Sequence, residues 1–187
     1  MLAGGTNEPR TREAYIEPPP DEGPTAEDLA IPEEAIAEAI ASSCLGFASK
    51  VEQHNLNLFA AFDNAFEHLV TRGDASGYPP MVDRFKPKFA ALEQNLERIA
   101  ARLDALKQVP LAGLVRRMAT AAPDRLEKKL EEQVLRQQVS VSELESEERP
   151  ALKERLKAVT ASLKTKDAAV EEVLEELRAE LADLDEE

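Results

Sequence analysis

A regular apolar repeat in the middle of the chain most strongly constrains what it can fold into. That repeat predicts a long helix packed against other helices, because steps of three and four place every member on one helical face. Pro87 lies inside the repeat. Because a proline within a helix costs about 3 kcal/mol, we expect the helix to begin there rather than to kink. The repeat consists of Val82, Phe85, Phe89, Leu92, Leu96, Ile99, Leu103 and Leu106.

Other segments carry the same helical spacing. Apolar residues between 36 and 69 recur in steps of three, four and seven, which predicts a helix that opens near Pro32. Pro110 is expected to end the helix of the central repeat, with a short helix after it and another that opens at Pro123. A last helix is expected from about residue 150 to 184. Two polar residues, Lys166 and Asp167, interrupt its apolar seam, where a polar position often fixes helix register.

Residues 72–80 form a break rich in glycine, with Gly73 suited to the left-handed conformation that closes a helix. A short connection of this kind predicts two antiparallel helices. We expect the flanking aromatic rings to meet across the hairpin, with the hydroxyl of the tyrosine in water. The alternative is an exposed aromatic pocket that captures a partner. The aromatic residues concerned are Phe62, Phe66, Tyr78, Phe85 and Phe89.

The fold class that follows is all-α, an antiparallel helical hairpin or bundle with long coiled-coil helices. Residues 1–30 are rich in proline and acidic residues, and we expect them to be disordered. Residues 31–140 are expected to form the helical domain, and residues 141–187 an acidic coiled-coil helix.

The net charge of −14 is concentrated at the two ends of the chain. Residues 1–39 and residues 140–187 each carry a net charge of −8, whereas the segment between them carries +2. Acidic flanks oppose binding to the phosphate backbone, so direct nucleic-acid binding is not expected. A weak basic signal comes from Arg84, Lys86 and Lys88 between two phenylalanines, and from Arg116 with Arg117.

No pattern of catalytic or ligand-binding residues is recognisable. The sequence has no phosphate-binding glycine loop, no CxxC and no HExxH, so we expect no enzyme activity, no cofactor and no metal. Cys44 is the one cysteine and is expected to be a buried apolar side chain, which fits a reducing, intracellular compartment. Neither a signal peptide nor a membrane span is expected.

The last helix is predicted to engage a partner. At about 35 residues it would span roughly 50 Å, more than a compact bundle covers, so part of its seam, with Leu174 and Leu181, should protrude. Its outer positions from Glu171 to Glu187 are acidic, with Arg178 the only base. We therefore expect a heterotypic partner helix with basic flanking positions, with a weak homodimer as the alternative.

Three segments within residues 56–182 together resemble the required-for-excision 1-B domain family. They are AAFDNAFEHLVTRGDASGYPPMVDRFKPKFAALEQNLERIAARL, PLAGLVRRMATAAPDRLEKKLEEQVLRQQ and ERLKAVTASLKTKDAAVEEVLEELRAEL. Phe62, Phe66, Gly73 and Tyr78 match the aromatic and turn part of the family pattern. Arg116 ends the match to its second part, after Leu111, Leu114 and Val115. The chain departs from the family after Arg116, where MATAAPD replaces the usual Gln and Glu.

The resemblance implies a nuclear protein linked to DNA excision repair, with no catalytic site to transfer. The function expected from it is a non-enzymatic helical factor that acts through protein partners. The alternative is a coiled-coil scaffold subunit of a vesicle-tethering or kinetochore type of assembly, which the apolar seams and acidic tails would equally suit.

Overall fold

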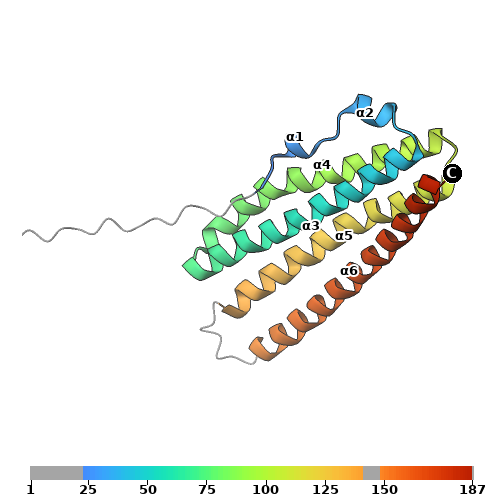
Figure 1. The fold of residues 1–187 in the computed structure, drawn as a ribbon. Helices are drawn as coiled ribbons and strands as arrows, with labels where there is room; N and C mark the ends of the chain where they lie inside the picture. Colours follow the sequence, from blue (N-terminus) through green and yellow to red (C-terminus); the bar gives the residue numbers. More distant parts are fainter. Residues whose placement is uncertain (1–22, 141–147, 187) are drawn as a thin grey trace, which may run out of the picture.

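The computed structural model describes residues 23–140 and 148–186, and this part of the chain is all-α, as predicted. Four long helices lie side by side with alternating direction in an elongated bundle (Figure 1). Two short helices, α1 (Ala26–Leu29) and α2 (Glu33–Ala37), lie on the outside against α4. The four long helices are α3 (Ala41–Arg72), α4 (Tyr78–Ala105), α5 (Val109–Ser140) and α6 (Glu148–Glu186).

The predicted hairpin between the first two long helices is present. Gly73 caps α3 in the left-handed conformation (φ 66°), and its N–H bonds to the carbonyls of Leu69 and Val70. A 3₁₀ turn, η1 (Ala75–Gly77), leads into α4, and the carboxylate of Asp74 accepts the Gly77 N–H at 3.0 Å. Glycine is needed at 73 because a side chain rarely adopts this conformation.

The first predicted helix is wrong in one respect, because it is two helices. The chain leaves helical geometry after α2, and Ile40 is extended (φ −84°, ψ 173°) and 63% exposed, so it is not part of the apolar seam. The guanidinium of Arg102 on α4 binds the carbonyl of Ala39 at 2.9 Å. This bond holds the backbone out of the continuous helix that the spacing favoured.

Two prolines lie inside helices, which corrects the predicted boundaries. Pro87 is within α4, and Pro123 is within α5, so the two helices expected after Pro110 are one. Both prolines lie at exposed positions, and the carbonyl that Pro87 leaves unpaired belongs to Asp83, which is also exposed to water. Burial of Phe85 and Phe89 on either side of Pro87 favours the continued helix.

The reversal between α4 and α5 is also different from the prediction. The chain turns at Lys107, which has a positive φ of 63°, and Pro110 is the second residue of the next helix instead of a terminator. Proline is well tolerated there, because the first-turn N–H groups have no partner within the helix.

The predicted disorder of residues 1–30 falls mostly on residues 1–22, which lie outside the described residues. For residues 23–30 it is wrong. Leu29 is only 4% exposed and belongs to the main core. The buried side chain of Leu29, with one hydrogen bond from Asn95 of α4 to its carbonyl, orders a segment whose composition predicted disorder.

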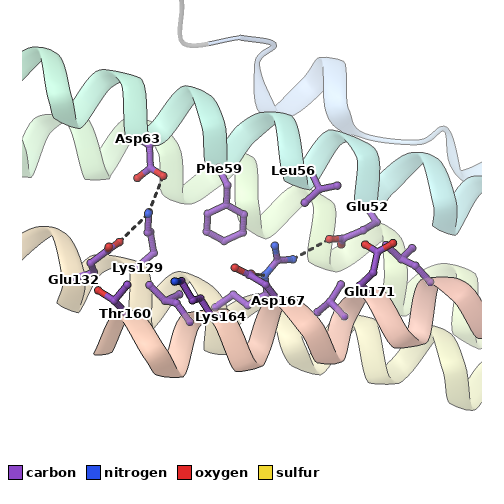
Figure 2. Close-up of a pocket in the computed structure, with 14 residues that line it drawn as sticks. Glu52, Leu56, Phe59, Asp63, Lys129, Glu132, Thr160, Lys164, Asp167 and Glu171 are labelled. Atoms are coloured by element: carbon purple, nitrogen blue, oxygen red, sulfur yellow. Dashed lines mark hydrogen bonds and ion pairs between the residues drawn. The ribbon is translucent and has the colours of Figure 1, made fainter. Parts of the chain in front are cut away.

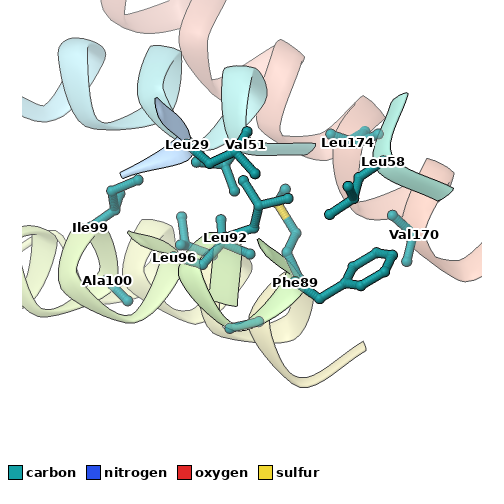
Figure 3. Packing of buried hydrophobic residues seen from close by; sticks show 14 of the residues in the cluster. Leu29, Val51, Leu58, Phe89, Leu92, Leu96, Ile99, Ala100, Val170 and Leu174 are labelled. Carbon is teal, nitrogen blue, oxygen red and sulfur yellow. The ribbon is translucent and has the colours of Figure 1, made fainter. Parts of the chain in front are cut away.

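The last helix packs into the bundle, so its expected protrusion is wrong. Leu174 is 4% exposed and Leu177 is fully buried, in the same core as α3 and α4 (Figure 3). The other long helices have 28 to 32 residues, so the bundle is nearly as long as the 39-residue α6. The division proposed at residues 140 and 141 therefore does not separate two packing units.

Candidate functional site

The aromatic residues around the turn pack inside the hairpin, as predicted. The ring centroids of Phe62 and Phe85 are 5.0 Å apart, and those of Phe62 and Phe89 are 6.0 Å apart. Phe66 meets Tyr78 edge-on at 5.8 Å. Phe62 and Phe66 are almost completely buried, so these side chains stabilise the hairpin and do not form an exposed partner pocket.

The prediction that the hydroxyl of Tyr78 lies in water is wrong. This oxygen is buried and has no hydrogen-bond partner among the described residues. Burial raises the pKa of Tyr78 to about 12, because the tyrosinate would be poorly solvated. The ring borders a small cavity of about 60 Å³ together with Phe66, Leu69 and Gln137.

The remaining sequence-predicted site residues do not converge on one place. Arg116 is exposed and forms an ion pair with Asp104, which lowers the pKa of that carboxyl through a hydrogen bond. Leu174 is buried in the core, and Leu181 is partly buried against it.

Three of the basic residues in the weak nucleic-acid signal, Lys88, Arg116 and Arg117, contact other groups of the protein. Lys88 is 9% exposed, with its ammonium 4.9 Å from the centroid of the Phe85 ring. Arg117 bonds to both carboxylate oxygens of Glu176 on α6, at 2.7 and 3.1 Å. Arg116 and Arg117 nevertheless line an open pocket on α5 together with Thr120 and Asp124, so the second basic spot remains accessible.

A larger cavity, of about 440 Å³, opens where α3, α5 and α6 meet (Figure 2). Its apolar wall includes Phe59 and Leu56, and Leu56 is 42% exposed. Its charged lining has five carboxylates and three cations, an excess of two negative charges. The carboxylates are Glu52, Asp63, Glu132, Asp167 and Glu171, and the cations are Arg125, Lys129 and Lys164.

Arg125 is the central charged group of this cavity. Its Nη1 donates to Glu52 Oε1 at 2.8 Å, and its Nε donates to Asp167 Oδ1 at 3.0 Å. The guanidinium also lies over the Phe59 ring, 4.9 Å from the centroid. Asn55 donates to the second oxygen of Glu52 at 3.1 Å. Arg125 therefore joins α3, α5 and α6 through one planar group.

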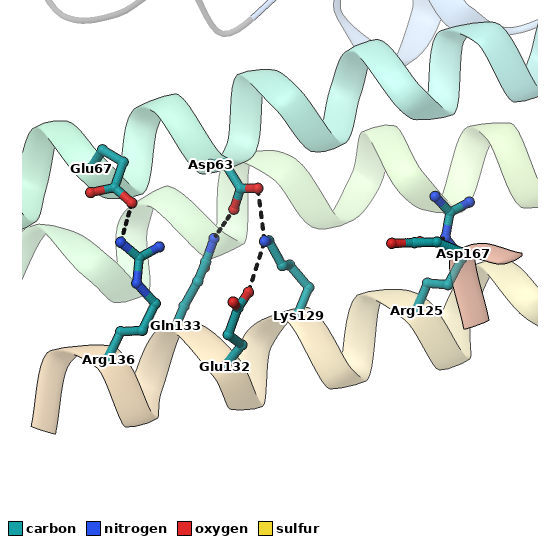
Figure 4. Close-up of polar contacts among 8 residues, drawn as sticks. All are labelled: Asp63, Glu67, Arg125, Lys129, Glu132, Gln133, Arg136 and Asp167. Atoms are coloured by element: carbon teal, nitrogen blue, oxygen red, sulfur yellow. Dashed lines mark hydrogen bonds and ion pairs between the residues drawn. The ribbon is translucent and has the colours of Figure 1, made fainter. Parts of the chain in front are cut away.

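A second polar row continues between α3 and α5 (Figure 4). Lys129 pairs with Asp63 and with Glu132, each at 2.8 Å, and Gln133 donates to the other oxygen of Asp63. Burial disfavours the charge on Lys129, but its two carboxylate partners outweigh this effect and raise its pKa. Arg136 pairs with Glu67 one turn further along.

Only one sequence feature points to this network, and it does so indirectly. The polar interruption at Lys166 and Asp167 predicts a fixed helix register, and both residues pair with residues of α5. Lys166 bonds to Asp124 at 2.9 Å, while Asp167 bonds to Arg125. Nothing in the sequence marks Glu52 or Arg125, because a buried charge is recognisable only when its partner is known.

Among the described residues, no group of three His, Cys, Asp or Glu side chains is arranged to hold a metal ion. The same part of the chain has no helix with both the length and the apolar character needed to cross a membrane. Cys44 is fully buried, as predicted, and burial raises its pKa.

No protein-family model, curated protein or solved structure matches the chain.

Proposed function

We propose that this protein is a non-enzymatic helical factor that acts in the nucleus, in excision repair of damaged DNA, by binding protein partners. The repair assignment is supported by the resemblance of residues 56–182 to the required-for-excision 1-B domain family. The aromatic part of that resemblance, Phe62, Phe66 and Tyr78, forms one packed cluster at the hairpin.

The observation that carries the partner proposal is the composition of the 440 Å³ cavity. Its mouth presents an exposed leucine, Leu56, beside an excess of carboxylates. A lysine or arginine side chain has an aliphatic stem that can contact the leucine and a cationic head that can pair with the carboxylates. We therefore expect the partner to insert a basic side chain here, in keeping with the net charge of −14.

The buried charges of the cavity support a structural rather than a catalytic role. Arg125 is bonded to Glu52 and Asp167, and Lys129 is bonded to Asp63 and Glu132. Ionised groups that neutralise one another in this way hold the helices in register. A general acid or base would instead need a titratable group turned towards a substrate.

The alternative function, a coiled-coil scaffold subunit, has less support. It rests on the apolar seams and acidic tails of the chain, and the seam of the last helix already has a partner. Val170, Val173, Leu174 and Leu177 of that seam are buried within the same chain.

The proposal is tested by deleting the gene in its source cell and measuring both survival and lesion removal after ultraviolet irradiation. The deleted cells should be sensitive and should retain lesions, and the wild-type gene should restore both. Normal survival together with normal lesion removal would contradict the repair assignment.

The cavity is tested by complementation with Leu56→Arg, which replaces the apolar wall and repels a basic side chain. Val134→Arg is the matched control, because Val134 is 39% exposed and does not line the cavity. We expect Leu56→Arg to lose repair and to lose partners in affinity purification, while Val134→Arg keeps both. Full complementation by Leu56→Arg would show that partners bind elsewhere.

A further inference from the structure

Residues 25–40, here called the strap, cross the outer face of α4. The helices of the strap are too short to be stable by themselves. The two helices of the strap have four and five residues, and isolated helices of this length are unstable in water. Figure 1 shows both on the outside of the bundle, beside α4. What holds the strap must therefore come from the surface beneath it.

Three side chains of α4 bind the main chain of the strap. Asn95 is 1% exposed; its amide donates to the Leu29 carbonyl at 2.8 Å and accepts the Ile31 N–H at 3.1 Å. Arg98 Nη1 donates to the Ile31 carbonyl at 3.0 Å, and Arg102 Nε donates to the Ala39 carbonyl at 2.9 Å. The spacing of 95, 98 and 102 places these groups on one helical face.

These bonds recognise a backbone path rather than particular side chains. The paired donor and acceptor of the Asn95 amide match the C=O and N–H of a passing peptide. Specificity then comes from the apolar anchors Leu29 and Ile36, each 4% exposed and seven residues apart, with Ala39 behind them. Figure 3 shows Leu29 beside Val51 and near Leu92 and Leu96 of α4.

The charge of the strap suits this surface. Its acidic residues Glu27, Asp28, Glu33, Glu34 and Glu38 are exposed, whereas the face beneath presents two guanidinium groups. The strap thus has the make-up of a peptide ligand, with aliphatic anchors, an acidic exterior and backbone hydrogen bonds to its host.

We propose that this face of α4 is a peptide-docking groove, which the strap fills in cis and a partner segment fills in trans. The partner segment carries two large aliphatic residues seven apart, with acidic residues between them. A second copy of the chain is the less suitable donor, because it would bring a second body with a net charge of −14. Ile40, which is exposed and extended, joins the strap to α3.

This groove is separate from the cavity between α3, α5 and α6, and it does not rest on the repair assignment. Either proposal can fail while the other holds. Because a tethered segment competes at roughly millimolar effective concentration, the wild-type protein should bind a free peptide only weakly. Weakening the strap should expose the groove.

The test uses the full chain and a fluorescent synthetic peptide of residues 23–40 as the probe. In the variant Leu29→Glu with Ile36→Glu, the strap loses both anchors while α4 is unchanged. By fluorescence anisotropy, this variant should bind the peptide at least about tenfold more tightly than the wild type does. Adding Asn95→Ala should abolish the gain, and a peptide with the same two glutamates should not bind.

Three results would overturn the proposal. The strap-weakened variant could keep a cooperative thermal transition and yet bind no more peptide than the wild type does. It could instead lose that transition, which would make the strap an integral part of the core. Lastly, the wild-type protein could dimerise through the groove as its concentration rises, with Asn95→Ala preventing it, which would assign the groove to a second copy.

Discussion

Arg125 Nη1 lies 2.8 Å from Glu52 Oε1, and both side chains are more than nine-tenths buried, so α3 and α5 are joined by an ion pair inside the bundle. The distribution of net charge along the sequence does not predict this ion pair. Burying an ion pair costs free energy of desolvation. Removing one partner costs more, because the other charge then stays buried without a counter-charge.

The first prediction concerns this pair. Arg125→Met should lower the free energy of unfolding by about 3–5 kcal/mol, since it leaves Glu52 charged and buried. Adding Glu52→Gln should recover part of that loss, because the amide oxygen still accepts from Asn55 and carries no charge. Urea unfolding of the two single variants and the double variant measures the coupling. A strictly additive double variant would contradict it.

The aromatic cluster gives the second prediction. Phe66→Ala and Phe89→Ala should each cost about 3–5 kcal/mol of stability, because both truncate rings packed within the hairpin. Leu56→Ala is a useful control, since Leu56 is 42% exposed and should change stability by about 0.5 kcal/mol or less. Near-zero melting shifts for both phenylalanine variants would place the rings at the surface.

A third prediction distinguishes a packed last helix from a protruding one. Leu174→Asp with Leu181→Asp should destabilise the whole bundle in a single transition, because Leu174 lies in the common core. Ala158→Asp, at an exposed position of the same helix, should leave the melting temperature nearly unchanged. Loss of partner capture with an unchanged melting transition in the double variant would restore the protruding seam.

The fourth prediction is a pH dependence that arises from Tyr78. Its pKa is raised from 10 in the unfolded chain to about 12 in the native state, so the native state holds its phenolic proton more tightly. The resulting stabilisation is complete below pH 10 and is lost as the pH rises from there through about 12. Tyr78→Phe should remove this loss.

Urea unfolding of wild type and Tyr78→Phe at neutral and at alkaline pH measures the effect as a difference between the proteins. At neutral pH the variant should be as stable as the wild type or more so, because it also removes a buried hydroxyl with no described partner. An equal decline of both proteins between pH 10 and 12 would show that Tyr78 titrates normally.

The fifth prediction is that the intact chain binds duplex DNA weakly at physiological salt, with a shallow salt dependence. Its net charge is −14, and the arginine and lysine residues at the sequence-predicted basic spots include Arg116, Arg117 and Lys88, which contact groups of the protein itself. Anisotropy of a labelled duplex over a range of salt concentrations is the measurement. Tight binding with a steep slope would refute this reading of the charges.

Local rules were enough to predict several features correctly from sequence. The steps of three and four from Val82 to Leu106 predicted a helix with one buried face. Gly73 predicted where α3 ends, and the aromatic residues around the turn predicted its packing. Each of these depends on spacing along one helix or on the conformational freedom of one residue, which a sequence displays directly.

Only the tertiary structure decided which local preferences were overruled. Pro87 lies within a helix because the packing of residues on both sides of it outweighs its local cost. Residues 25–40 are ordered because Asn95, Arg98 and Arg102 donate hydrogen bonds to their backbone carbonyls. The last helix is buried because its neighbours are nearly as long. Arg125 and Glu52, 73 positions apart, become partners only when α3 and α5 meet. Contacts between residues far apart in the sequence depend on which helices pack together, and the spacing of residues along one helix does not predict this.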